Sequence, residues 1–173
     1  MAKNTKTLVL GGARSGKSAY AETLGAAHGA ALTYIATAQA WDDEMKARIA
    51  THIARRGADW TTVEAPVALP EAITENAGAD GFILVDCLTL WLTNVILGDH
   101  DVDQAVSQLK QAVEAAPGRL VLVSNEVGLG IVPDNPLGRR FRDEAGRLNQ
   151  RMAEICDQVV FIAAGMPLKL KPQ

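Results

Sequence analysis

The chain has 173 residues, 48% apolar and 21% charged, which is the composition of an ordinary globular protein of about one domain. Its 17 basic and 20 acidic residues leave a net charge of −3, so there is no global electrostatic basis for binding nucleic acid. No apolar run approaches the roughly 18 residues that a membrane span needs, and the first residues lack a signal-peptide core. The two cysteines, Cys87 and Cys156, have no metal-site spacing and form no disulfide framework. We therefore expect a single cytoplasmic domain over residues 1–173, without a nucleic-acid partner.

Short apolar runs alternate with helical segments along the chain. The runs are apolar on both faces, which is typical of parallel strands buried in a sheet. They are Thr7–Leu10, Leu32–Ile35, Phe82–Val85, Leu120–Val123 and Val159–Ile162. The segments predicted to be helical are residues 17–28, 42–56, 68–76, 102–115 and 136–157. This alternation predicts an α/β fold with a mostly parallel sheet, in which ligands bind beyond the carboxyl ends of the strands.

The first predicted strand runs into a glycine-rich segment that fits the phosphate-loop pattern G-x-x-x-x-G-K-[ST]. Its residues are Gly11, Gly12, Ala13, Arg14, Ser15, Gly16, Lys17 and Ser18. Glycines let backbone N–H groups approach an anion, and the following helix adds the positive end of its dipole. Lys17 is expected to neutralise the β- and γ-phosphates, and Ser18 to hold Mg²⁺. The segment therefore predicts nucleotide binding.

Asp86 follows the predicted strand Phe82–Val85. This is the expected place for a Walker B carboxylate that holds Mg²⁺ or its water. An alternative interpretation is a helix N-cap, since a helix could begin at Cys87. No N-K-x-D guanine-recognition motif is present, which argues against a Ras-like GTPase but leaves GTP open as a ligand.

The predicted helix over residues 42–56 carries a histidine on a basic face. Arg48, His52 and either Arg55 or Arg56 recur one helical turn apart. One interpretation is an imidazole presented to a phosphate, kept neutral by the neighbouring cations and able to attack phosphorus. The other is a solvated basic face with an incidental histidine, and the spacing does not choose between them. The remaining histidines, His28 and His100, are expected to have no role.

Five arginines gather in the predicted helix over residues 136–157. They are Arg139, Arg140, Arg142, Arg147 and Arg151. The loop before them, Asn125–Asn135, leaves the carboxyl end of a strand, where binding sites form. Asp143 and Glu144 lie among the arginines, so a salt-bridged surface helix or a subunit contact explains them equally well.

Several of these segments together resemble one enzyme family, the bifunctional adenosylcobinamide kinase/adenosylcobinamide-phosphate guanylyltransferases of cobalamin biosynthesis. The resemblance runs nearly end to end, and its most restrictive part is Asn125–Pro133, followed by Phe141–Asp143 and the pairs Gly146-Arg147 and Asn149-Gln150. Also shared are the phosphate loop, the segment Tyr34–Ala38, and residues 42–45 with Arg48, Ile49 and His52.

The resemblance implies two reactions. A nucleoside triphosphate, ATP or GTP, phosphorylates adenosylcobinamide, and GTP then transfers GMP to that phosphate, with pyrophosphate as the second product. The family's second reaction passes through a guanylylated histidine, which matches His52 here. The family also resembles RecA-type P-loop proteins and forms homotrimers.

The resemblance further implies where GTP is bound. The matching residues, besides the phosphate loop, are Ile35, Ala36, Thr37, Ile53, Ala54, Arg55, Arg56, Glu64 and Asp86. Two positions depart from some relatives: Thr51 replaces the first residue of a His-His pair, and Asp86 replaces a glutamate. A plain metabolite kinase with an incidental His52 and a nucleotide-dependent switch remain competing hypotheses.

Overall fold

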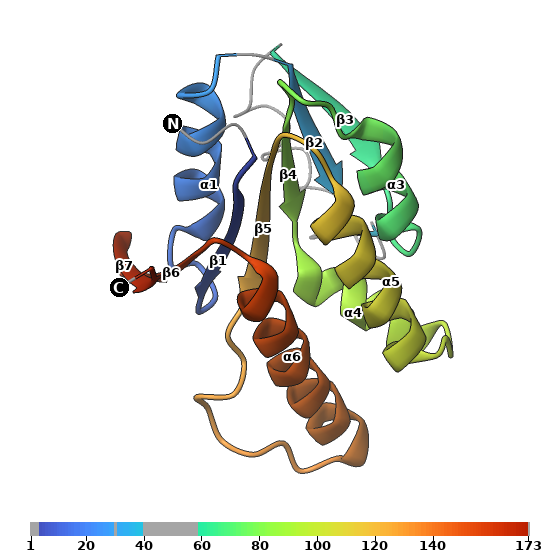
Figure 1. Cartoon of the computed structure of the whole chain (residues 1–173). Helices are drawn as coiled ribbons and strands as arrows, with labels where there is room; N and C mark the ends of the chain where they lie inside the picture. Colours follow the sequence, from blue (N-terminus) through green and yellow to red (C-terminus); the bar gives the residue numbers. More distant parts are fainter. Residues whose placement is uncertain (1–3, 30, 40–58, 173) are drawn as a thin grey trace.

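The computed structural model describes residues 4–29, 31–39 and 59–172 (Figure 1). Within these ranges the core is a seven-stranded sheet in the order β3-β2-β4-β5-β1-β6-β7. Every neighbouring pair is parallel except β6 and β7, which are antiparallel. The strands are β1 (Lys6–Gly11), β2 (Leu32–Ala36), β3 (Trp60–Glu64), β4 (Phe82–Asp86), β5 (Arg119–Asn125), β6 (Gln158–Ala163) and β7 (Met166–Lys171).

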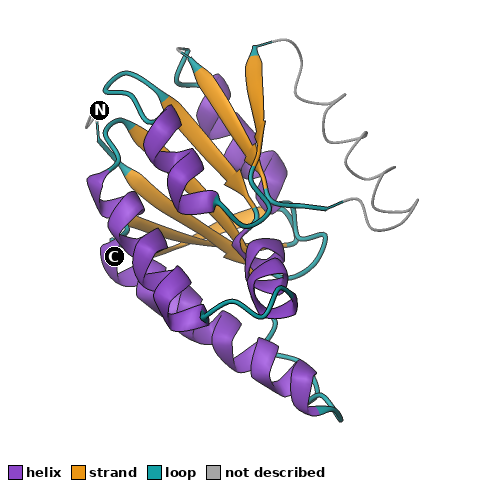
Figure 2. Cartoon of the chain, turned by 90° about the vertical axis from the view of Figure 1, so that its right-hand side faces the viewer, coloured by secondary structure: helices purple, strands orange, loops and turns teal. Residues whose placement is uncertain are grey.

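Helices cover both faces of the sheet, so the fold has three layers with the sheet in the middle (Figures 1 and 2). They are α1 (Lys17–Ala26), α3 (Leu69–Asn76), α4 (Leu88–Leu97), α5 (Val102–Ala115) and α6 (Pro136–Ile155). α1 packs on one face, where Ala21 joins a cluster with Val9, Leu84 and Val121. α3, α4, α5 and α6 pack on the other face, in a larger cluster that includes the fully buried Trp91.

Helix starts are set by local sequence. The Asp101 carboxylate accepts a hydrogen bond from the Gln104 N–H at the start of α5. The Asn135 carboxamide oxygen does the same for the Gly138 N–H at the start of α6, where Pro136 occupies the first turn. Of the helices in the described ranges, none is long and apolar enough to cross a membrane.

The predicted α/β fold with a mostly parallel sheet is confirmed, as are all five predicted strands. Four of the predicted helices are present with ends shifted by at most a few residues, and the helix predicted over residues 42–56 lies outside the described ranges. The alternative interpretation of Asp86 as a helix N-cap is wrong. Asp86 is the last residue of β4, and Cys87 is the residue that precedes α4.

Two strands, β3 and β7, were not predicted, and α4 was raised only in the alternative that a helix could begin at Cys87. The outer strands β3 and β7 are half-buried or exposed along most of their length, so they lack the apolar runs of central strands. α4 is apolar nearly all round because it is buried between the sheet and its neighbouring helices, so it shows no amphipathic pattern.

Candidate nucleotide-binding site

The predicted phosphate loop joins the carboxyl end of β1 to the first turn of α1. Gly11 and Gly16 have φ angles of +153° and +103°, which side-chain-bearing residues rarely adopt. A Cβ at Gly11 would lie 2.5 Å from the carbonyl oxygen of Ile162 and 2.7 Å from Ser15 Oγ. The loop therefore requires glycine at these positions, and it holds backbone N–H groups at the N-terminus of α1, where anions bind.

Two polar groups in this loop lack an outside partner. Of the residues described, Ser15 alone has a buried side-chain polar atom, Oγ, without a hydrogen bond. Lys17 is buried, and its Nζ donates to the loop's own Gly12 carbonyl at 2.5 Å. Burial lowers the pKa of Lys17, while the neighbouring Cys87 and Asp86 act in the opposite direction. A phosphate seated in the loop would supply acceptors to both side chains, so this part of the chain fits a nucleotide.

Asp86 ends β4, which is two strands away from β1, with β5 between them. Its Oδ2 accepts a hydrogen bond from the Tyr34 hydroxyl at 3.0 Å, which fixes the carboxylate. Ser18 is half-buried in the first turn of α1. The described residues contain no group of three or more His, Cys, Asp or Glu side chains that could hold a metal alone. A hydroxyl and a carboxylate suit Mg²⁺, which completes its coordination with water and substrate phosphates.

The other predicted nucleotide contacts lie at the same edge of the sheet. Ala36 is level with Asp86 on one side and with Glu64 on the other. Ile35 is fully buried. His52 and the segment Ile53–Arg56, which includes Ala54 and Arg55, lie outside the described ranges.

Thr37 is fully buried and joins the end of β2 to the start of α4. Its hydroxyl donates to the Cys87 carbonyl at 2.7 Å and accepts from the Cys87 N–H at 2.8 Å. The Thr37 carbonyl accepts from the Asn94 side chain at 2.9 Å. These bonds occupy the Thr37 hydroxyl and hold Cys87, the residue after Asp86, in place.

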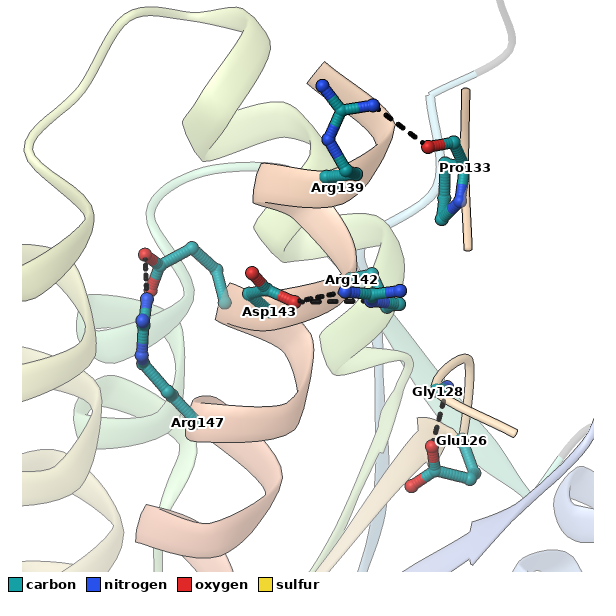
Figure 3. Close-up of polar contacts among 8 residues, drawn as sticks. Glu126, Gly128, Pro133, Arg139, Arg142, Asp143 and Arg147 are labelled. Atoms are coloured by element: carbon teal, nitrogen blue, oxygen red, sulfur yellow. Dashed lines mark hydrogen bonds and ion pairs between the residues drawn. The ribbon is translucent and has the colours of Figure 1, made fainter. Parts of the chain in front are cut away.

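Most arginines of α6 are engaged in bonds of their own, as the close-up in Figure 3 shows. Arg142 pairs with Asp143 at 2.9 Å and Arg147 with Glu144 at 2.6 Å. Arg139 donates to the Pro133 carbonyl at 3.0 Å. Arg151 pairs with Asp103 of α5 at 2.9 Å, and Arg140 is exposed. The salt-bridged interpretation of this helix is therefore confirmed for these pairs.

The loop between β5 and α6 extends beyond the carboxyl edge of the sheet (Figure 1). Leu129 and Ile131 are 83% and 98% exposed there. Glu126 accepts the Gly128 N–H at 2.6 Å, which tightens the start of the loop. The Glu126 N–H donates to the Gly11 carbonyl at 3.0 Å, so this loop and the phosphate loop are joined at their bases.

A buried polar network behind the site was not predicted. Ser124 Oγ donates to Asn149 Oδ1 at 2.7 Å. Thr89 Oγ1 accepts the Asn125 N–H at 2.7 Å, and Asn149 Nδ2 donates to the Asn125 carbonyl at 3.3 Å. The network ties the end of β5 to α4 and α6. In the sequence, Asn125–Pro133 and Asn149 carry the family resemblance, but their spacing indicates none of these contacts.

The sheet, the glycine loop at the N-terminus of α1, and the Asp86 carboxylate two strands away define a P-loop NTPase fold. Solved structures with this fold are similar over most of the chain. The match with the RadB recombinase covers 92% of this chain and 74% of the recombinase chain, with a TM-score of 0.54 and 14% identity. The match with the flagellar accessory protein FlaH from Methanocaldococcus jannaschii covers 96% of this chain and 78% of the FlaH chain, with a TM-score of 0.53 and 12% identity.

Sequence comparison then specifies the family. Residues 7–170 match the CobU family, described as cobinamide kinase / cobinamide phosphate guanyltransferase. The bifunctional adenosylcobalamin biosynthesis protein CobP of Pseudomonas aeruginosa is 53% identical over 168 residues, covering 96% of this chain and 97% of that protein. The bifunctional adenosylcobalamin biosynthesis protein CobU of Salmonella typhimurium is 42% identical over 179 residues, covering 95% and 98%. The chain belongs to this family of bifunctional enzymes, which confirms the resemblance drawn from its motifs.

Proposed function

We propose that the protein catalyses two successive reactions on one corrinoid, first phosphorylating adenosylcobinamide and then converting the product to adenosylcobinamide-GDP. The observation that carries this proposal is the family match over residues 7–170, on a chain in which Asp86 lies close enough to Lys17 of the phosphate loop to raise its pKa against the effect of burial. ATP or GTP is the donor in the first reaction, and GTP is the donor in the second.

In the kinase reaction, the hydroxyl oxygen of the corrinoid's aminopropanol arm attacks the γ-phosphorus. The bond from the γ-phosphorus to the β,γ-bridging oxygen breaks, the nucleoside diphosphate leaves, and the hydroxyl proton is released. Lys17 and the backbone N–H groups of the phosphate loop stabilise the charge that develops on the phosphates. Ser18 and Asp86 would hold Mg²⁺, which when bound neutralises phosphate charge.

In the guanylyl transfer, His52 is the nucleophile. A neutral imidazole nitrogen attacks the α-phosphorus of GTP, the bond to the α,β-bridging oxygen breaks, and pyrophosphate leaves with its charge stabilised by Lys17. The corrinoid phosphate then attacks the same phosphorus, the N–P bond breaks, and His52 recovers its neutral form. The GMP group is thus transferred in two oriented steps, first to His52 and then to the corrinoid phosphate. These steps replace a direct encounter between the two anions, GTP and the corrinoid phosphate.

The remaining nucleotide contacts belong to this proposal. They are Gly11, Gly12, Ala13, Arg14, Ser15, Gly16, Ile35, Ala36, Thr37, Ile53, Ala54, Arg55, Arg56 and Glu64. The support for them is the family membership and, for the described residues, their place at the carboxyl edge of the sheet. The proposal further includes assembly into a homotrimer and a cytoplasmic location. Size-exclusion chromatography with light scattering would test the homotrimer.

The decisive experiment uses GTP labelled at the α-phosphate, with Mg²⁺ and no corrinoid. After denaturation, the wild-type protein is expected to retain label in a bond that is labile to acid and stable to base, as a histidine phosphoramidate is. His52→Ala should retain none. His100→Ala is the matched control, because His100 is exposed in the loop after α4 and should leave labelling unchanged.

Label that persists in His52→Ala would overturn the assignment of the nucleophile. A folded wild-type protein that binds GTP but never retains label would overturn the covalent mechanism, and a plain kinase would then be favoured. Transfer of the γ-phosphate to adenosylcobinamide, followed separately with γ-labelled ATP and GTP, tests the first reaction and its donor.

A further inference from the structure

Asn125 is the last residue of β5, the strand that lies between the phosphate loop and Asp86. It is level with Gly11 on β1, and Val123, two residues earlier on β5, is level with Asp86 on β4. Neighbouring strands lie about 4.8 Å apart, so the Asn125 backbone lies on the strand between the phosphate loop and the Asp86 carboxylate. Both proposed partners of a triphosphate therefore lie one strand away from it.

The alternation of side chains places Asn125 on the face that carries α1. Val121 and Val123 on β5 belong to the cluster that packs against α1, as do Val9 on β1 and Leu84 on β4. Because side chains on a strand alternate between faces, Asn125, Gly11 and Asp86 share the face of those residues. Ser124, in contrast, bonds to Asn149 on the face covered by α6.

The Asn125 backbone is held on both sides while its side chain is unengaged. Thr89 accepts its N–H and Asn149 donates to its carbonyl, so both backbone groups are fixed. Thr89 and Asn149 are each 7% exposed and are themselves tied together through Ser124. Among the described residues, no partner binds the half-buried Asn125 carboxamide. A network that fixes a backbone so tightly beside an unengaged polar side chain is suited to presenting that side chain to a ligand.

The chemistry of a carboxamide suits the last phosphate of a triphosphate. Its NH₂ group donates two hydrogen bonds and carries no charge, so it can approach the γ-phosphate beside the Asp86 carboxylate. An aspartate of the same shape would offer acceptors alone and would repel the phosphate. A neutral donor on β5, between the strands of the phosphate loop and Asp86, could therefore approach the phosphate without repelling it.

We propose that the Asn125 carboxamide contacts the γ-phosphate of the bound nucleotide, so that it distinguishes a triphosphate from a diphosphate. The inference rests on the proposed function only in that a nucleotide occupies the phosphate loop. Asn149 is a positioning residue in this arrangement, because it acts through the Asn125 backbone.

The test compares affinities for α,β-methylene-GTP and α,β-methylene-GDP, in which the methylene group prevents guanylyl transfer. Wild type is expected to prefer the triphosphate. Asn125→Ala should reduce that preference roughly 10-fold or more, since a hydrogen bond to a charged group is lost, and Asn125→Asp should reduce it further. Affinity for the diphosphate should stay within about twofold of wild type in Asn125→Ala. Gln108→Glu, the same amide-to-acid change on the exposed face of α5, is the control and should leave both affinities unchanged.

A wild-type triphosphate preference in both Asn125 variants would overturn the inference. So would an equal loss of both affinities, because that points to a general disturbance of the loop. The melting temperature of each variant shows whether it is folded, and two substitutions keep the test decisive if one does not fold. Labelling of His52 in wild type is measured separately, so failure of the proposed function is distinguishable from failure at Asn125.

Discussion

Replacing Ser124 with alanine tests the buried network that holds the end of β5. Ser124 is 2% exposed, and its hydroxyl donates to Asn149 Oδ1 at 2.7 Å. Alanine removes that donor and adds nothing that can replace it. Asn149 is 7% exposed, so water has little access to the acceptor left behind.

The expected cost follows from that burial. Leaving a buried acceptor without a partner costs about 1–3 kcal/mol, whereas an exposed hydrogen bond costs far less because water replaces it. For a chain of this length, each kcal/mol lowers the melting temperature by about 2–4 °C. Ser124→Ala should therefore lower the free energy of unfolding by about 1–3 kcal/mol, with the midpoint of urea unfolding shifted and its slope unchanged.

Ser107→Ala is the matched control for this experiment. Ser107 also donates its hydroxyl at 2.8 Å, to the Asp103 carbonyl, but it lies on the exposed face of α5. Its substitution should change stability by less than about 0.5 kcal/mol. If Ser124→Ala unfolds at the same urea concentration as Ser107→Ala, the network is not a structural support and the reasoning fails.

Two further predictions concern the site and pH. Tyr34→Phe removes the hydroxyl that donates to Asp86 at 3.0 Å, so we expect guanylylation to need several-fold more Mg²⁺ and to recover at high Mg²⁺; a loss that Mg²⁺ does not restore would contradict a role through the carboxylate. Burial, with a smaller contribution from Asp157, raises the pKa of Cys156 to about 12, above the ordinary value of 9.0. The unfolded thiol thus loses its proton first, and stability should fall as pH rises from 9 towards 12, by up to about 1.4 kcal/mol per pH unit from this group. Unfolding of wild type and Cys156→Ala between pH 8 and 11 measures the contribution of the thiol together with its interaction with Lys6, while Cys87 and Lys17 are common to both proteins; parallel curves would refute it.

The central strands and the phosphate loop could be predicted from sequence because each depends on local composition. A strand buried on both faces, such as β4, is apolar whatever its neighbours are, and the loop's glycines are required by its own backbone. β3 and β7 were missed because the outer strands bury little, and α4 was raised only as an alternative because it buries almost everything and shows no amphipathic pattern. In each case the burial that sets the sequence pattern depends on packing partners that the local sequence does not reveal.

The site residues divide in the same way. The positions of Lys17 at the start of α1 and of Asp86 at the end of β4 could be predicted because a motif and an apolar strand mark them. Tyr34 could not be assigned to Asp86, because the two are 52 residues apart and meet only through the pairing of β2 with β4. Likewise, no local pattern indicates that Thr37 contacts Cys87 beyond the ends of the same two strands.

The motif that identified the family takes on a physical meaning in this fold. Asn125 and Asn149 are 24 residues apart and flank an exposed loop, yet the second side chain fixes the backbone of the first. The Glu126 N–H fixes the carbonyl of Gly11 at the base of the phosphate loop. A change in how α6 packs would thus move the end of β5 and the phosphate loop together. Because α6 follows directly from the exposed loop, these hydrogen bonds connect the loop, the end of β5 and the base of the phosphate loop.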